Sequence, residues 1–313
     1  MRVKMKKKYR QIGQRMKKDW QLYLFLLIPV IYIIIYRYVP MGGVVIAFKD
    51  YKVRKGIFGS DWIGFDNFIR FFSSYQCKRV ISNTIILSLY SIIAGFPIPI
   101  IFALMINSLR NEKFKKVSQT IVNMPHFIST TVMVGIILQV FNPRTGLYGV
   151  ITEMLTGKYP TDILGSPSVF RHLYVWTGIW QEFGWSSIIY IASLASVSPD
   201  LHEAAEIDGA SRFQRIIHID FPSILPTVIT MLILRMGSVM SVGFEKVYLM
   251  QNGLNMETSD IISTMVYNVS LAAEGISDFS YGASIDLFNS VVNLIMITTV
   301  NYISRKVSET SLW

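Results

Sequence analysis

The sequence predicts an all-α membrane protein with six transmembrane helices. The chain has 313 residues, of which 51% are hydrophobic and only 16% are charged, and its mean hydropathy is +0.41. A soluble domain carries about 25% charged residues. Residues 80–109, 117–143 and 287–304 contain no Asp, Glu, Lys or Arg at all. Because a helix needs about 20 mostly apolar residues to cross a bilayer, these segments predict membrane spans.

The apolar runs place the six spans at about 20–39, 80–106, 117–142, 172–197, 222–244 and 284–304. No small-residue cleavage site follows the first run, so we expect a retained helix and no signal peptide. Pro97 and Pro99 are expected to kink the second span, because each removes a helical hydrogen bond. In the third span, His126 follows Pro125, and we expect it to hydrogen-bond at a helix kink, where proline leaves a backbone acceptor free.

Basic residues predict the orientation of the spans. Nine Lys or Arg lie in residues 1–19 and four more in residues 110–116. Lys and Arg accumulate on the cytoplasmic side of membrane proteins, where anionic lipids attract them. We therefore expect both termini in the cytoplasm: residues 1–19 form a basic tail, 20–304 form one transmembrane domain and 305–313 form the C-terminus. The basic residues that give the chain its net charge of +10 are then expected to contact membrane lipids, and no nucleic-acid partner is expected.

The loop of residues 37–79, which this topology places outside, is also basic and carries many aromatic residues. Both kinds of side chain favour the membrane interface, so we expect a short helix that lies in that layer. A role of this loop in substrate binding stays open.

A polar segment, residues 198–222, separates the fourth and fifth spans and includes EAAEIDGASRFQRIIHIDFP. Pro199 suits the first position of a helix, and Gly209 suits its end. Ser211 and Gln214 have the spacing of a capping box, which starts a second helix. Each arm has about 10 residues and spans roughly 15 Å, too short to cross a bilayer. This elbow is expected on the cytoplasmic face, where it either contacts another protein or rests on lipid as an amphipathic connector.

The spacing within this elbow resembles a family signature. It reads Glu203-Ala204-Ala205, three residues, Gly209, nine residues, Ile219, one residue, Phe221-Pro222. The pattern is similar to the EAA signature of binding-protein-dependent ABC importer permeases, in which Leu is usual where this chain has Phe. The stretches RYVPMGGVVIAFKDY, GFDNFIRFF and LASVSPDLHEAAEIDGA resemble the sugar branch, which handles oligosaccharides and polysaccharide fragments. The resemblance covers nearly the whole chain.

The resemblance implies that the elbow is a coupling helix that sits in a cleft of a separate ATPase subunit. The residues that it implies for docking are Glu203, Ala204, Ala205, Asp208 and Gly209. The two carboxylates suit charge-assisted contacts, the alanines allow close approach, and the glycine fixes the bend.

The resemblance further implies a set of partners. These are a second homologous permease subunit that completes a heterodimer, two ATPase subunits, and an extracytoplasmic solute-binding protein that delivers an oligosaccharide cargo. The chain itself would be a multi-pass protein of a bacterial-type plasma (inner) membrane.

Several chemical motifs are absent. The sequence contains no G-x-x-x-x-G-K-[ST] phosphate loop, no zinc-type Cys/His cluster and no G-x-S-x-G elbow. We therefore expect no enzyme activity, metal or cofactor on this chain, and expect ATP and Mg²⁺ on the partner ATPase. The single cysteine, Cys77, excludes an internal disulfide.

Two charged residues inside the spans, Glu182 and Arg235, indicate the cargo path. Such charges are costly and usually face a cavity or a partner. Both lie roughly 20 Å from the cytoplasmic ends of their helices, near the depth at which transport sites occur. Gln181, Trp185 and Ser238 are expected to line the same path, because indole rings stack on sugar faces and polar groups bind hydroxyls. A purely structural Glu182–Arg235 ion pair is the alternative.

In the sixth span, Asp286, Asn289 and Asn293 form one polar stripe. Hydrogen bonding between helices is its expected role, ahead of contact with the cargo.

A second class of function is an ion-gradient-driven secondary sugar transporter with Glu182 as the proton-coupling group. The elbow argues against this function, because such carriers have no ATPase subunit to which an elbow could bind.

Overall fold

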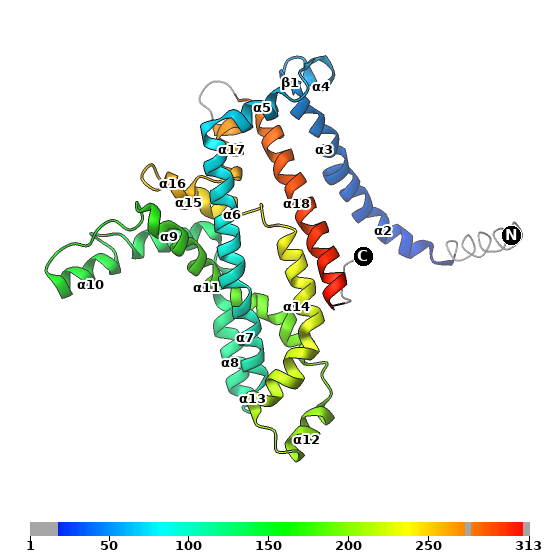
Figure 1. Ribbon diagram of the computed structural model, residues 1–313, viewed down its shortest axis with the longest axis vertical. Coiled ribbons are helices and arrows are strands. Elements are labelled where there is room, and N and C mark those ends of the chain that lie inside the picture. The colour runs from blue at the N-terminus through cyan, green and yellow to red at the C-terminus, as the bar shows by residue number, and fades with distance from the viewer. Residues whose placement is uncertain (1–17, 273–276, 309–313) are drawn as a thin grey trace, which may run out of the picture.

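A computed structural model of the chain describes residues 18–272 and 277–308. Over these residues the chain is mostly helical and contains one two-stranded hairpin (Figure 1). Most of the basic tail, residues 1–17, and the C-terminal residues 309–313 lie outside the described residues, so the expectations for them are not examined by the structure.

The first span is one helical rod from Trp20 to Phe48. Its parts are α2 (Trp20–Ile33), η1 (Ile34–Tyr38), α3 (Val39–Met41) and η2 (Gly42–Phe48). The side chains of α2 are exposed on every face, and η2 is the part that packs against α18 (Figure 1). A helix that is apolar all round suits a lipid environment.

A small hairpin unit follows at the upper end of the molecule in Figure 1. It consists of β1 (Lys49–Asp50), α4 (Gly56–Gly59), β2 (Asp61–Trp62) and α5 (Asp66–Ser73). The strands are antiparallel, with Lys49 opposite Trp62, and the ring of Phe48 stacks on Trp62 at 5.7 Å. The short helix expected in this loop is thus present as α5. Its buried Phe71 contacts Phe288 of α18.

The second span, Tyr75–Asn107, is made of α6 (Tyr75–Gly95) and α7 (Pro97–Asn107). The two helices meet at Phe96, directly before Pro97. The backbone at Phe96 is helical and its N–H donates to the Ile92 carbonyl, so the kink expected at the prolines stays a prediction.

The third expected span is sharply bent near Pro125, where a kink was expected. The chain forms α8 (Glu112–Asn123), η3 (Met124–Phe127) and α9 (Thr130–Val140), followed by the separate α10 (Leu147–Thr156). The α8–η3 and α9 axes differ by 94°. Pro125 has no N–H to continue an α-helical ladder, Ile128 is extended, and the Ser129 hydroxyl caps α9. The pair therefore forms a broken span or a re-entrant loop.

The remaining helices surround the long helix α11. They are α11 (Pro167–Leu194), α12 (Pro199–Ile207), α13 (Arg212–Arg215), η4 (Ile216–Asp220), α14 (Phe221–Met236), α15 (Phe244–Met250), α16 (Met256–Ser259), α17 (Ile262–Tyr267), η5 (Asn268–Ala272) and α18 (Phe279–Ser308). α11 packs against α6, α7, α8 and α14. At Gly184 of α11, an added Cβ would lie 2.3 Å from the carbonyl oxygen of Val122, so glycine is required for this approach to α8.

Within the described ranges, four helices are long and apolar enough to cross a membrane, or five if the bent pair counts as one span. These numbers are lower than the six expected spans. The fourth expected span corresponds to α11, which has 28 residues but carries charged and polar side chains such as Arg171 and Glu182.

The elbow and the hairpin unit lie at opposite ends of the long axis (Figure 1). α6 with α7 runs between these two ends, and α14 reaches the elbow, whereas α18 ends well short of it. The central part of α11 therefore lies between the two ends, surrounded by helices that reach the elbow.

Candidate functional site

Local interactions shape the first arm of the elbow. The Ser198 hydroxyl accepts a hydrogen bond from the Asp200 N–H (3.3 Å), and Pro199 occupies the first turn of α12. The arm ends at Gly209, whose φ of +79° lies in the left-handed region. The N–H of Ala210 then donates to the Ala205 carbonyl at 2.8 Å. The expected glycine corner is confirmed, because a residue with a Cβ is strained in this conformation.

The second arm begins with the expected capping box. The Ser211 N–H donates to Gln214 Oε1 at 2.7 Å, and the Gln214 N–H donates to the Ser211 hydroxyl at 3.3 Å. The arm is not a separate short helix, however, because α13 continues through η4 into α14. Pro222 lies in the first turn of α14, where its missing N–H is tolerated, and the wider π-helical turn of η4 precedes it.

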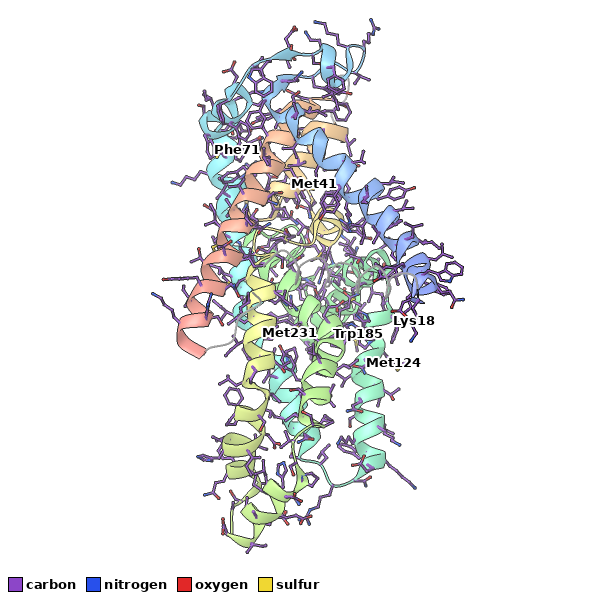
Figure 2. All side chains as sticks on the ribbon, turned by 90° about the vertical axis from the view of Figure 1, so that its right-hand side faces the viewer. Lys18, Met41, Phe71, Met124, Trp185 and Met231 are labelled. Atoms are coloured by element: carbon purple, nitrogen blue, oxygen red, sulfur yellow. The ribbon has the colours of Figure 1, made fainter. Side chains whose placement is uncertain are left out.

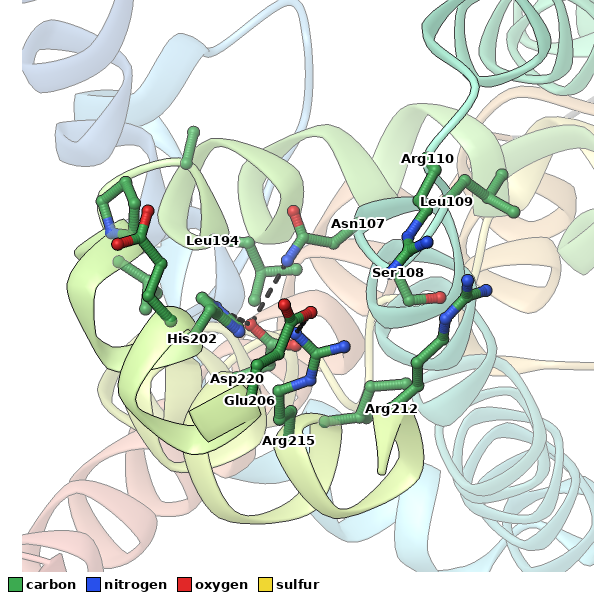
Figure 3. A pocket seen from close by; sticks show the side chains of 15 residues that line it. Asn107, Ser108, Leu109, Arg110, Leu194, His202, Glu206, Arg212, Arg215 and Asp220 are labelled. Carbon is green, nitrogen blue, oxygen red and sulfur yellow. Dashed lines mark hydrogen bonds and ion pairs between the residues drawn. The ribbon is translucent and has the colours of Figure 1, made fainter. Parts of the chain in front are cut away.

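Buried polar contacts tie the elbow to two long helices (Figure 3). The Asp220 side chain is almost fully buried, and its Oδ1 accepts a hydrogen bond from Asn107 Nδ2 at 3.2 Å. The same oxygen lies 3.3 Å from Nε2 of His202. Glu206 pairs with Arg215. We call Asn107, His202 and Asp220 the elbow clasp. Sequence analysis did not identify it, although two of its members lie within the polar segment.

The five expected docking residues lie along the first arm of the elbow and at its corner, and Glu203 also lines a cavity of about 460 Å³ beside the elbow clasp. Glu203, Ala204, Asp208 and Gly209 are exposed and Ala205 is half-buried. Across residues 18–272 and 277–308, no ion pair or side-chain hydrogen bond involves the carboxylate of Glu203 or Asp208. Ile207, which is 87% exposed, adds an apolar side chain beside them. This surface combines free carboxylates, small residues and exposed apolar groups.

A second site lies midway along α11. A cavity of about 260 Å³ is bordered by α6, α7, α11, α14 and α15, and its wall includes Ser91, Gln181, Glu182, Arg235, Gly243 and Lys246. Arg235 also lines two adjoining cavities, one with Trp185 and one with Ser238. The structure therefore brings all five expected cargo-path residues around adjoining cavities. We call the first of these, the cavity of about 260 Å³, the central cavity.

Within the central cavity, Glu182 pairs with His126. The Nδ1 of His126 lies 3.0 Å from Glu182 Oε2, which accepts the hydrogen bond. The alternative ion pair between Glu182 and Arg235 is not found in the part of the chain that the structure describes. His126 does lie at the break after α8, as expected, but its partner is a carboxylate and not a freed backbone carbonyl.

Two more expected residues stabilise the same break. The ring of Trp185 stacks on that of His126 at 4.4 Å, with 5° between their planes. Gln181 Nε2 donates to the Ile128 carbonyl at 2.8 Å. One face of the indole is thus covered, yet Trp185 remains 47% exposed and lines a cavity with Met231 (Figure 2).

Sequence analysis missed Lys246, because it lies just beyond the expected fifth span. It is only 8% exposed, and its Nζ donates to the Tyr174 carbonyl at 3.0 Å. The one available signal was a lysine directly before an apolar run, in FEKVYLM.

The polar stripe of α18 forms hydrogen bonds at Asn293, though to the segment after α14 and not to another helix. Its side chain accepts from the Met240 N–H (2.9 Å) and donates to the Ser241 hydroxyl (3.1 Å), which joins α18 to the segment after α14.

Comparisons with known proteins agree with this arrangement. The family model described as "Binding-protein-dependent transport system inner membrane component" matches residues 83–309. Protein LplB of Bacillus subtilis (strain 168) is 40% identical over 298 residues, which cover 95% of this chain and 92% of that protein. The polygalacturonan/rhamnogalacturonan transport system permease protein YteP of the same organism is 36% identical over 308 residues, or 98% and 95% of the two chains.

The solved structures include a close match as well. A chain of a bacterial ABC transporter involved in the import of the acidic polysaccharide alginate superposes with a TM-score of 0.85 and 36% identity, over 95% of this chain and 99% of that chain. The same kind of transporter in complex with an alginate pentasaccharide-bound periplasmic protein gives a TM-score of 0.86.

Proposed function

Because this chain belongs to the family of binding-protein-dependent transport system inner membrane components, the multi-pass permeases of bacterial ABC importers, we propose that it forms half of a pore for an oligosaccharide. The family membership favours ATP-driven transport over the ion-gradient-driven carrier that the sequence had left as an alternative. A second homologous permease subunit would complete the pore as a heterodimer.

The other partners follow from the same assignment. Two ATPase subunits would bind ATP and Mg²⁺, and an extracytoplasmic solute-binding protein would deliver the cargo. In this proposal, six spans cross the membrane and both termini are cytoplasmic. Residues 1–19 form the tail, 20–304 the transmembrane domain and 305–313 the C-terminus. The separation of the elbow and the hairpin unit at opposite ends of the molecule supports this orientation (Figure 1).

The cargo is proposed from the central cavity and from relatives. YteP carries the name of a polygalacturonan/rhamnogalacturonan system, and the structural relative takes part in alginate import. In this chain, Gln181, Glu182, Trp185, Arg235 and Ser238 surround adjoining cavities, with the stacking and hydrogen-bonding groups that a polyhydroxylated molecule needs.

The observation that carries the coupling role is the free outer surface of the elbow. The carboxylates of Glu203 and Asp208 are exposed and unpaired within the described ranges, and Gly209 holds the left-handed corner between them and the second arm. The buried elbow clasp behind this surface ties it to α7 and α14. A force applied to the elbow by an ATPase would therefore reach the helices that border the central cavity.

The test is a pair of substitutions in the full importer complex. Glu203→Lys reverses a docking charge, and Gly209→Pro replaces a φ of +79° with one near −65°. We expect both to reduce co-purification of the ATPase subunits or to separate ATP hydrolysis from uptake. Glu257→Lys is the control, because it makes the same charge change on an exposed residue of α16. Normal ATPase attachment and normal uptake in both elbow variants would reject the coupling role.

A further inference from the structure

The wall of the central cavity carries two cationic side chains that have no carboxylate in ion-pair contact among the described residues. Lys246 and Arg235 line it, and neither forms an ion pair over residues 18–272 and 277–308. The one carboxylate in the cavity wall is Glu182, and its Oε2 is occupied by His126 at 3.0 Å. The wall therefore carries an excess of positive charge.

Lys246 is held in a specific position. An ammonium group has three N–H donors, and Nζ uses one of them on the Tyr174 carbonyl at 3.0 Å. Nζ also lies 5.0 Å from the centre of the Tyr174 ring. Gly178 of α11 provides the space, because a Cβ added there would lie 3.3 Å from Nζ. A buried ammonium with no anion in direct contact is costly, and Glu182 acts on Lys246 only from a distance, so a ligand that supplies an anion is favoured here.

Arg235 presents its guanidinium to the same space. It lies in the last turn of α14 and lines the central cavity together with both adjoining cavities. The side chain is exposed in this chain, and no described residue accepts a hydrogen bond from its guanidinium. The planar guanidinium matches a carboxylate through two parallel hydrogen bonds.

We propose that Arg235 and Lys246 together bind the carboxylate of a uronic acid in the cargo. This inference rests on the proposed function, and it narrows the cargo to acidic oligosaccharides. The other parts of the wall suit the rest of such a sugar: the Glu182 carboxylate and the Ser91 hydroxyl can bind sugar hydroxyls, and the exposed part of Trp185 can cover an apolar face in the adjoining cavity. Neutral sugars would satisfy the hydroxyl-binding groups and leave both cations unpaired.

Binding of defined saccharides to the purified importer complex in nanodiscs tests the inference. The probes are tetragalacturonate and the neutral tetragalactose, measured by equilibrium dialysis at constant ionic strength. We expect the parental complex to bind tetragalacturonate at least about tenfold more tightly, because hydrogen bonds to charged groups are stronger than neutral ones. Arg235→Gln and Lys246→Met should each reduce this preference to about threefold or less.

The control variant is Lys158→Gln. It removes one positive charge from an exposed residue after α10 and should leave the preference unchanged. Lys246→Met introduces an apolar side chain of similar length, so it leaves no buried, unpaired polar group at the end of the side chain. If that variant does not assemble, Arg235→Gln decides the question, because Arg235 is exposed and its substitution leaves the packing intact.

The inference would be overturned by equal binding of the two saccharides to the parental complex, by binding of neither, or by an undiminished preference in Arg235→Gln. Competition by inorganic phosphate as effective as that by galacturonate would also reject it, because it would indicate a site for any small anion. A failure of the proposed function looks different. In that case the ATPase subunits would not co-purify and uptake would not require ATP, whatever the saccharide preference.

Discussion

Glu182 and His126 are separated by 56 residues in the sequence, yet their side chains meet at 3.0 Å in the central cavity. Trp185 then covers the imidazole at 4.4 Å. The three side chains connect the middle of α11 to the break between α8 and α9. A residue expected to bind cargo thus also has a positioning role, because Trp185 holds the ring that orients the Glu182 carboxylate.

At this scale we predict that Trp185→Ala reduces uptake of the importer's oligosaccharide by about tenfold. An aromatic contact contributes about 0.5–1.5 kcal/mol, and 1.4 kcal/mol corresponds to a factor of ten. The ATPase subunits should stay attached, because the elbow is unchanged. Transport into proteoliposomes gives the measurement, and Trp185→Phe, which retains an aromatic face, should keep most of the rate. Parental uptake by Trp185→Ala would show that the cargo contacts lie elsewhere, such as on the second permease subunit.

The elbow shows how one element combines local and long-range interactions. Its cap at Ser198, its corner at Gly209 and its capping box at Ser211 are local, since each involves residues at most a few positions apart. Its attachment to the rest of the molecule is long-range, because Asn107 reaches Asp220 across 113 positions. The corner therefore sets the shape of the elbow, and the clasp sets its place on α7 and α14.

We predict that Asp220→Ala destabilises the complex by about 1–3 kcal/mol, because it leaves the half-buried polar groups of Asn107 and His202 without their partner. Asp220 is 3% exposed, so water cannot replace the lost contacts without rearrangement. The midpoint of thermal unfolding should fall by about 2–4 °C for each kcal/mol, and fewer saccharides should enter per ATP hydrolysed. Asp200→Ala, on an exposed carboxylate in the same arm, should change the midpoint far less. Equal midpoints for the two variants would show that the clasp contributes nothing to stability.

On the scale of the whole molecule, charge and shape agree on one orientation. The elbow lies at the lower end of Figure 1 and the hairpin unit at the upper end. Basic residues 110–116 cover the end of the link after α7 and the start of α8, and Arg110 lines a cavity together with residues of the elbow. Cytoplasmic loops collect Lys and Arg, so this end of the molecule is the proposed cytoplasmic side.

We predict that residues 1–19, 107–116 and 198–221 are cytoplasmic. A cysteine at position 211 (Ser211→Cys) should react with a membrane-impermeant reagent only after the cells are made permeable. A cysteine at position 161 (Thr161→Cys), in the exposed loop after α10, should react in intact cells. The parental chain provides the background, since its single cysteine, Cys77, is buried. Labelling of Ser211→Cys from outside intact cells would reverse the topology.

The sequence by itself determined the helical membrane class, the caps of the elbow and its glycine corner. These features depend on near neighbours or on the apolar character of a segment, both of which can be read along the chain. It also singled out five residues that line adjoining cavities, and their contact with cargo stays a prediction. Only the tertiary structure decided that the chain after α8 turns by 94°. It also decided that Glu182 pairs with His126 and not with Arg235, and that Lys246 lies in the wall of the central cavity. Hydropathy identifies which segments avoid water. It does not give the direction of the chain after a proline or the partner of a buried charge, because both depend on contacts with side chains of helices that are distant in the sequence.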